Sequence, residues 1–305
     1  MQSVKHRIVT ANSSLKQFRE SHIPTGSPGE GFLRTSSYEY GPEDLRSICD
    51  SFWWLCDYMG GLTPSQFYIK WNRPELASNP NDKGYQRALT DYVRAHRQNA
   101  RLDYSDPTIF TYFDQAYFYR NFLKCLVGAH LISALYPRLA RSKTVIDVGS
   151  GVGTFAIACQ LIRSFPQANY LIVDQCTYQI EIARFLISHL LFENFKFRQA
   201  DAFQEFSRRG LLISSYWLCG NKEGVLKKSD EELRFILRDG MVLIDYDINI
   251  MAFKERIKSL RPRLHQCNVH APLIRDVQQF VGSRDLNVHM LIVDRFDATQ
   301  STPDL

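Results

Sequence analysis

The sequence predicts an α/β fold built on a doubly wound sheet, and three observations support this prediction. Apolar segments of strand length alternate with segments of helical period from residue 144 to about residue 260. A glycine-rich loop separates the first of these strands from the helix that follows it. Three successive strands end in an acidic residue: Asp147, Asp174 and Asp201. This order of strands and helices favours a largely parallel sheet with helices on both faces.

The glycine-rich loop covers residues 147–153 and reads Asp-Val-Gly-Ser-Gly-Val-Gly. Its glycines remove the side chains that would hold a ligand away from the backbone, and the amides at the start of the following helix carry positive partial charge. A dinucleotide fingerprint would carry its third glycine at position 154, where this chain has Thr154. The loop therefore predicts a nucleotide-type cofactor and disfavours a nicotinamide dinucleotide.

The second predicted strand, 170–173, ends at Asp174, about twenty residues after the loop. A carboxylate at this point can accept hydrogen bonds from both hydroxyls of a ribose, which supports an adenosine-containing cofactor. The other strands are expected over 195–200, 211–214 and 241–244, and then near Val269 and over 286–293 as an antiparallel pair that closes the sheet.

The acidic-x-Gly-x-Gly-x-Gly motif at 147–153 resembles that of the class I S-adenosylmethionine-dependent methyltransferases, and the resemblance covers roughly residues 106–295. It implies a Rossmann-like, doubly wound, seven-stranded methyltransferase sheet with S-adenosyl-L-methionine as the cofactor. In this family an acid near Asp201 approaches the adenine amino group. The resemblance implies these cofactor-binding residues: Asp147, Gly149, Ser150, Gly151, Gly153, Asp174, Gln175, Asp201, Ala202 and Ser214.

A narrower part of the chain is similar to proteins described as sugar O-methyltransferases. The similarity lies in residues 170–174, in the helix predicted over 178–191 and in residues 212–216. The chain departs from that pattern where residues 175–177 replace a Leu-Pro-Glu turn and where Ser215 replaces an Asn. The resemblance therefore does not decide which compound accepts the methyl group.

Methyl transfer is an in-line displacement, so the protein contributes mainly by aligning the acceptor and excluding water. A hydroxyl acceptor benefits from a base, whereas an amine need only arrive neutral. The catalytic candidates are Asp247, Tyr216 and His270. Asp245 is expected to hold the edge of the sheet, and Tyr216 and Trp217 follow the fourth strand, where the family commonly holds its acceptor. A magnesium-dependent variant with carboxylates at strand tips is the alternative to a base.

The residues before the glycine loop are expected to form an arm and a helical lid. We expect residues 1–105 to be this N-terminal region and residues 106–305 to be the methyltransferase domain. The segment 3–41 has the composition of an extended or mobile arm. Helices are predicted over 42–59, over 82–100 with a basic side, and from the cap Asp106 to about Tyr136, and aromatic residues concentrated in these helices are expected to be mostly core.

The composition favours a cytoplasmic enzyme. We expect no signal peptide and no membrane span, because the first thirty-five residues are polar and no long apolar window follows. Seven cysteines without paired CxxC spacing argue against a disulfide scaffold and a structural zinc. The formal charge of +5 neither requires nor excludes nucleic acid.

We therefore expect methylation of a small-molecule or sugar hydroxyl by a protein that does not associate with membranes. The alternatives are RNA or amine N-methylation, in which the basic helix would contact phosphates, and a methyltransferase-like binding protein without turnover. The RNA alternative is less favoured because Ser214-Ser215-Tyr216-Trp217 stands where many base-amine methyltransferases carry Asn-Pro-Pro-Tyr.

Overall fold

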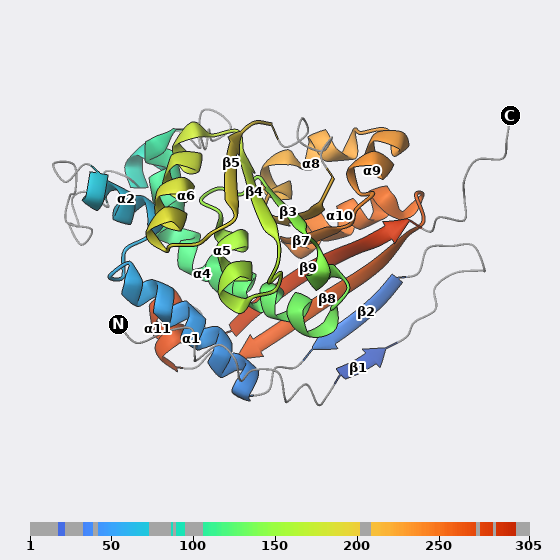
Figure 1. The fold of residues 1–305 in the computed structure, drawn as a ribbon, viewed down its shortest axis with the longest axis horizontal. Helices are drawn as coiled ribbons and strands as arrows, with labels where there is room; N and C mark the ends of the chain where they lie inside the picture. The colour runs from blue at the N-terminus through green and yellow to red at the C-terminus, as the bar shows by residue number, and fades with distance from the viewer. Residues whose placement is uncertain are drawn as a thin grey trace, which may run out of the picture.

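A computed structural model describes residues 18–21, 33–38, 42–72, 87, 90–94, 106–201, 209–272, 275–282 and 285–296. Its centre is one sheet of nine strands in the order β1-β2-β8-β9-β7-β6-β3-β4-β5 (Figure 1). Seven of these strands are those that the sequence predicts: β3 (Thr144–Val148), β4 (Asn169–Asp174), β5 (Phe195–Gln199), β6 (Leu211–Ser215), β7 (Met241–Asp245), β8 (Pro262–Pro272) and β9 (Asp285–Phe296).

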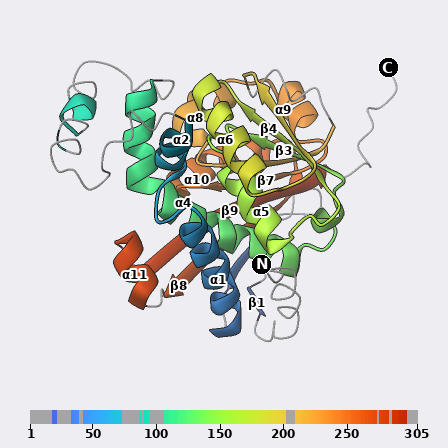
Figure 2. The same ribbon diagram turned by 60° about the vertical axis from the view of Figure 1, so that its left-hand side comes forward.

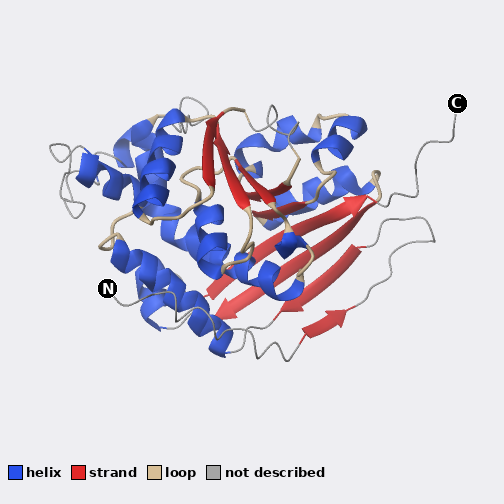
Figure 3. Cartoon of the chain, viewed as in Figure 1, coloured by secondary structure: helices blue, strands red, loops and turns tan. Residues whose placement is uncertain are grey.

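The seven-stranded part is a doubly wound sheet with one reversed strand. β3 pairs in parallel with β4 on one side and with β6 on the other, so the order of the strands reverses at β3. β9 runs antiparallel to both β7 and β8, which confirms the predicted closing pair; this long pair is prominent in Figure 3. Ligands of doubly wound sheets bind at the carboxyl edge beside such a reversal, which is where the glycine loop follows β3.

Two short strands from the predicted arm extend the sheet beyond seven. β2 (Leu33–Tyr38) pairs in parallel with β8, and β1 (Phe18–Ser21) pairs antiparallel with β2. The two described segments of the arm, residues 18–21 and 33–38, are therefore strands. Its composition alone does not indicate this, because the pairing depends on the open backbone edge that β8 offers at a distant point of the chain.

The helices form two layers on opposite faces of the sheet (Figures 1 and 2). On one face, side chains of the strands such as Ile213 and Ile292 form a hydrophobic core with α1, α4, α5 and α6. On the other face, the alternate strand residues, such as Leu212 and Leu291, form a second core with α8, α9 and α10. The helices are α1 (Pro42–Tyr58), α2 (Pro64–Asn72), α4 (Pro107–Leu135), η3 (Leu139–Arg141), α5 (Thr154–Ile162), α6 (Thr177–His189), α8 (Leu218–Leu226), α9 (Asp230–Ile236), α10 (Asp247–Lys258) and α11 (Arg275–Val281).

The long helix α4 begins and ends as the sequence predicts. Its cap residue Asp106 accepts hydrogen bonds from the amides of Thr108 and Ile109 at 2.7 and 3.3 Å. At 29 residues α4 is about 44 Å long, and it also contacts α2.

A buried carboxylate fastens α2 to α4. The side chain of Asp114 on α4 accepts hydrogen bonds at 2.9 and 2.5 Å from the amide and the hydroxyl of Ser65, in the first turn of α2. Burial raises the pKa of Asp114, and the Ser65 donors oppose this shift. The hydroxyl of Tyr119 on α4 also donates to the carbonyl of Leu62 at 2.5 Å. These bonds hold the predicted lid against the domain.

The predicted helix over 82–100 lies mostly outside the described residues. Arg87 and residues 90–94 are helical, and Arg87 and Arg94 are exposed. Arg94 forms an ion pair at 3.1 Å with Asp91 on the same helix. Within the residues that the structure describes, no helix is long and apolar enough to cross a membrane.

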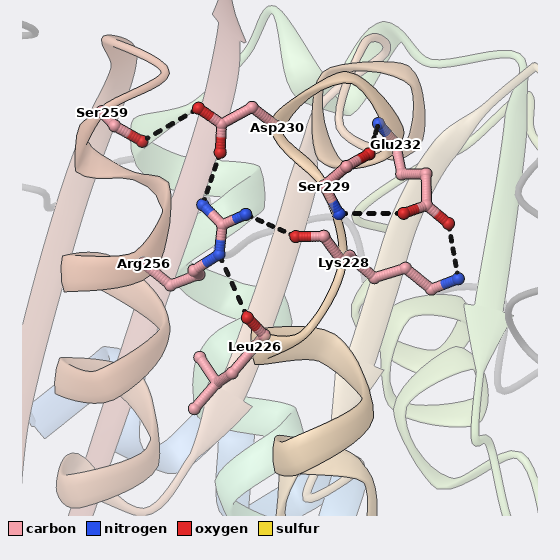
Figure 4. Close-up of polar contacts among 7 residues, drawn as sticks. All are labelled: Leu226, Lys228, Ser229, Asp230, Glu232, Arg256 and Ser259. Carbon is pink, nitrogen blue, oxygen red and sulfur yellow. Dashed lines mark hydrogen bonds and ion pairs between the residues drawn. The ribbon is translucent and has the colours of Figure 1, made fainter.

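The predicted capping box at the start of α9 is present, and it belongs to a polar network that joins α9 to α10 (Figure 4). The hydroxyl of Ser229 accepts from the amide of Glu232 at 3.2 Å, and the Glu232 carboxylate accepts from the amide of Ser229 at 2.8 Å. Arg256 on α10 donates to Asp230 at 2.7 Å and to the carbonyls of Leu226 and Lys228. This network fixes α10, whose first turn borders the carboxyl edge of the sheet.

Candidate functional site

The three glycines of the loop after β3 have left-handed backbone conformations, with φ of 58° at Gly149, 57° at Gly151 and 78° at Gly153. An added Cβ would lie 2.2 Å from Cδ1 of Trp217 at Gly149 and 3.3 Å from Cδ1 of Ile187 at Gly153. At Gly151 the nearest described atom is Oε1 of Gln179, at 3.4 Å, with nothing else within 4 Å. Two glycines therefore permit close packing, and Gly151 faces open space.

Asp174, at the end of β4, holds this loop in place. Its carboxylate accepts from the amide of Gly151 and from the amide of Cys176, both at 2.9 Å. Burial raises the pKa of Asp174, and the two amide donors oppose that shift. Each carboxylate oxygen has capacity for a second hydrogen bond, so these contacts are compatible with the predicted ribose hydroxyls.

Asp147, at the end of β3, is fully buried. Its Oδ2 accepts from the amide of Ala156 at 3.1 Å, at the start of α5, whereas its Oδ1 has no hydrogen-bond partner among the described residues. Burial raises the pKa of Asp147 to about 8. A buried polar atom without a partner costs free energy unless a ligand or water satisfies it. The unsatisfied oxygen and the open space at Gly151 both fit a polar cofactor lying against this loop.

The other residues predicted to bind cofactor differ in their exposure. The amide of Ser150 donates to the carbonyl of Val173 at 3.1 Å, and the hydroxyl of Ser214 donates to the carbonyl of Val148 at 3.0 Å, so both tie the loop region to the sheet. Gln175 and Asp201 are exposed at the same edge. Ala202 lies outside the described residues.

Tyr216 follows β6 and has a left-handed backbone, with φ of 59°. This conformation is uncommon for a residue with a large side chain, and such residues concentrate at functional sites. Its ring packs edge-on against that of Tyr246, with the centroids 5.3 Å apart, and the ammonium of Lys124 on α4 lies 5.3 Å and 5.9 Å from the two centroids. The structure thus brings together the tips of β6 and β7 and the middle of α4.

Trp217, the second residue after β6, is buried. Its side chain is 7% exposed, and its ring packs against Gly149. Trp217 is therefore buried beside the glycine loop, and its predicted place near the acceptor stays a prediction. The physical reason for this burial is the left-handed turn at Tyr216, which directs the next side chain into the core between the glycine loop and α8.

The two acids after β7 have different environments, as the sequence predicts. Asp245 is buried and accepts from the amides of Leu218 and Tyr246 at 3.1 and 2.7 Å and from Nδ2 of Asn249 at 2.8 Å, so it holds the edge of the sheet. Asp247, in the first turn of α10, is exposed. Only the second acid is accessible to an acceptor.

Asp247 lies beside a histidine that the sequence reasoning missed. Nδ1 of His289 on β9 is 3.6 Å from Oδ1 of Asp247 and 3.2 Å from Oδ1 of Asn268 on β8. His289 stands opposite Asp245 in the β7–β9 register, which brings it to the carboxyl edge of the sheet. The sequence carries no signal for His289, because the register that places it is set by the tertiary structure. The predicted His270 lies on β8 opposite Asn287, and its side chain is outside the described residues.

Apolar side chains surround the accessible acid. Tyr246, Ile248 and Met251 are 52%, 72% and 40% exposed, at the start of α10. These three side chains place apolar surface beside the accessible acid along the chain. Among the described residues, no group of three or more His, Cys, Asp or Glu side chains is placed to hold a metal ion.

Comparison with known proteins gives the family of the domain. Residues 139–282 match the sequence profile of a family described as a methyltransferase domain. No curated protein sequence matches the chain significantly.

Three solved structures resemble the chain at low identity. They are precorrin-6y C5,15-methyltransferase from Geobacter metallireducens (9% identity, 56% of this chain and 87% of that chain, TM-score 0.42), a SAM-dependent methyltransferase from Agrobacterium tumefaciens (12%, 56% and 61%, TM-score 0.40) and an O-methyltransferase family protein from Burkholderia thailandensis (16%, 79% and 73%, TM-score 0.38). None of these scores reaches 0.5, so they do not bear on the acceptor.

The matched profile, the strand order and the glycine loop with its strand-end acids agree with one another. The nucleotide-type cofactor that the loop predicts is S-adenosyl-L-methionine. Residues 139–282 form a methyltransferase domain, and the chain is an S-adenosylmethionine-dependent methyltransferase.

Proposed function

We propose that this enzyme methylates a hydroxyl group of a small molecule, either a phenol or a sugar. The observation that carries the proposal is the group formed by Asp247, His289 and Asn268 at the carboxyl edge of the sheet. The side-chain oxygens of Asp247 and Asn268 both approach Nδ1 of His289, which favours a proton on Nδ1. Nε2 then carries the lone pair that can accept a proton from a hydroxyl acceptor.

The cofactor is proposed to lie along the glycine loop, at the tips of β3 and β4, away from the group of Asp247, His289 and Asn268. Gly151 would leave room for it, and Asp174 would accept from its ribose hydroxyls. When bound, the cofactor supplies an electrophilic methyl group for an in-line displacement. The protein then has to align the acceptor oxygen and receive its proton.

Residues 1–105 are proposed to act as the lid of the acceptor site, and residues 106–305 as the catalytic domain. The attachment of α2 to α4 through Asp114 and Ser65 supports a fixed position for this lid. The exposed side chains of Tyr246, Ile248 and Met251 supply an apolar rim against which an acceptor can exclude water.

The test is an acceptor screen with sugars and phenols, followed by variants of the proposed base. We expect O-methylated product from at least one class, and we expect His289→Gln to lower kcat about 10²- to 10⁴-fold, the usual contribution of a general base. Asp247→Asn should lower kcat less, because His289 keeps its contact with Asn268. Both variants should retain the wild-type affinity for S-adenosylhomocysteine.

Glu255→Gln is the matched control, because Glu255 is another exposed acid on α10. This control should keep wild-type turnover. Wild-type turnover in His289→Gln, or product methylated only on nitrogen, would contradict the proposal.

A further inference from the structure

Lys124 occupies an unusual position for a lysine. It lies in the middle of α4, half-buried, with its ammonium over the faces of two tyrosine rings from the tips of β6 and β7. A ring face attracts a cation electrostatically and leaves its formal charge in place. Lysine has three N–H donors on that ammonium, so a ring-held lysine remains suited to binding an anionic oxygen.

The rings that hold Lys124 are themselves fixed by the fold. The amide of Tyr216 donates to the carbonyl of Ile244 at 2.8 Å, and the next residue, Trp217, is anchored in the core. Tyr246 follows Asp245, whose carboxylate accepts from the Tyr246 amide. The ammonium is therefore held at a defined place at the carboxyl edge before any ligand arrives, which lowers the cost of binding.

This place lies on the acceptor side of the site. Asp174, the proposed ribose acid, is at the tip of β4, on one side of β3, whereas Tyr216 and Tyr246 follow β6 and β7 on the other side. Tyr246 is also the neighbour of Asp247, the acid that approaches His289. The cation and the proposed base thus flank the same part of the edge.

We propose that Lys124, Tyr216 and Tyr246 form the recognition site for an acidic acceptor, a hydroxy acid whose carboxylate pairs with the Lys124 ammonium. This inference rests on the proposed function, because it names the class of hydroxyl compound that the enzyme methylates. The tyrosine rings provide apolar faces for the carbon skeleton of the acceptor, and the exposed Ile248 extends them. The carboxylate fixes the orientation in which the hydroxyl reaches the base.

The experiment compares two probes that differ mainly in charge, 4-hydroxybenzoate and 4-hydroxybenzyl alcohol. Each is titrated calorimetrically into the full chain saturated with S-adenosylhomocysteine. We expect the wild-type protein to bind the benzoate at least about tenfold more tightly, as a charge-assisted hydrogen bond allows. Lys124→Met should remove that preference, and Lys124→Arg should keep part of it. Lys196→Met, at an exposed lysine on β5, is the control and should behave as wild type.

Two further readouts separate the possible failures. The thermal midpoint of Lys124→Met, measured beside that of the wild type, verifies that the variant is folded. Equal binding of the two probes, no binding of either, or loss of S-adenosylhomocysteine affinity in Lys124→Met with the probe preference retained would overturn the inference. Because binding needs no turnover, a charge preference without O-methylated product would overturn the proposed function and leave the Lys124 site standing.

Discussion

The two halves of the carboxyl edge are built differently. On the cofactor half, at β3 and β4, Asp147 and Asp174 are buried, and each accepts hydrogen bonds from backbone amides. On the acceptor half, Asp247, Tyr246 and His289 are exposed or half-buried, and they come from different elements. The first half is a rigid cradle made by consecutive elements of the chain, and the second is an open surface assembled from separate ones. This difference is what we expect if the first half binds the cofactor and the second half binds the acceptor.

The largest effect on the cofactor half is expected from Gly151→Val. The variant adds a branched side chain at a left-handed position, and it fills the open space beside the loop. We expect the affinity for S-adenosylhomocysteine to fall by more than about 100-fold, since backbone strain costs about 1–3 kcal/mol before steric overlap is added. Calorimetric titration measures this change.

Gly151→Ala is the matched control for that experiment. Its Cβ meets only Oε1 of Gln179, at an ordinary van der Waals distance, so the strain remains and most of the overlap disappears. A smaller loss than in Gly151→Val would locate the cofactor at this glycine. Equal and full affinity in both variants would remove the loop from the cofactor site.

An intermediate effect is expected from Asp174→Ala. The variant removes the proposed acceptor of the ribose hydroxyls, and it leaves the amides of Gly151 and Cys176 without partners. We expect cofactor binding to weaken by about 1–3 kcal/mol, the usual cost of losing a hydrogen bond to a charged group. Titration below the thermal midpoint separates this loss from unfolding. Full affinity in this variant would show that the ribose lies elsewhere.

The last effect is expected from Asp147→Asn, and it concerns the pH dependence of stability instead of cofactor affinity. The folded-state pKa of about 8 lies above the value near 3.9 of an unfolded aspartate, so the unfolded chain loses its proton first as pH rises. The free energy of unfolding of the wild type should therefore decrease from about pH 4 to about pH 8. Asn does not titrate and can still accept the hydrogen bond from the amide of Ala156. The free energy of unfolding of the variant should therefore lack the decrease that Asp147 causes in the wild type as pH rises.

Thermal midpoints of the ligand-free protein, measured from pH 5 to pH 8 for both proteins, test this expectation. As pH rises, the thermal midpoint of the variant should increase relative to that of the wild type. Parallel curves would mean that Asp147 is already ionised in the folded protein.

The cofactor half was predictable from the sequence because its signals are local. A strand, three alternate glycines and an apolar helix follow one another within twenty-one residues, from 144 to 164, and the acid of the next strand completes the pattern. Apolar runs of strand length were enough to place β3 to β9 in order. Capping chemistry placed the start of α4 at Asp106 and that of α9 at Ser229.

The acceptor half was less predictable because its members meet only through tertiary structure. His289 reaches the edge through the register of β9 on β7, and Lys124 reaches it through the packing of α4 on the sheet. The burial of Trp217 follows a single left-handed residue, Tyr216, which the sequence does not indicate. Strand β2 depended on the free edge of β8. None of these features leaves a periodic or motif-like signal in the sequence.

The measurement that tests the division of the edge most directly is calorimetric titration of S-adenosylhomocysteine into five proteins, with NAD and NADH as controls. These are the wild type, two variants of the cofactor half, Gly151→Val and Asp174→Ala, and two of the acceptor half, Lys124→Met and His289→Gln. The account predicts that the wild type binds S-adenosylhomocysteine and neither nicotinamide, that the first pair loses affinity, and that the second pair keeps it. Full affinity in the first pair, or a comparable loss in the second, would contradict the assignment of the two halves.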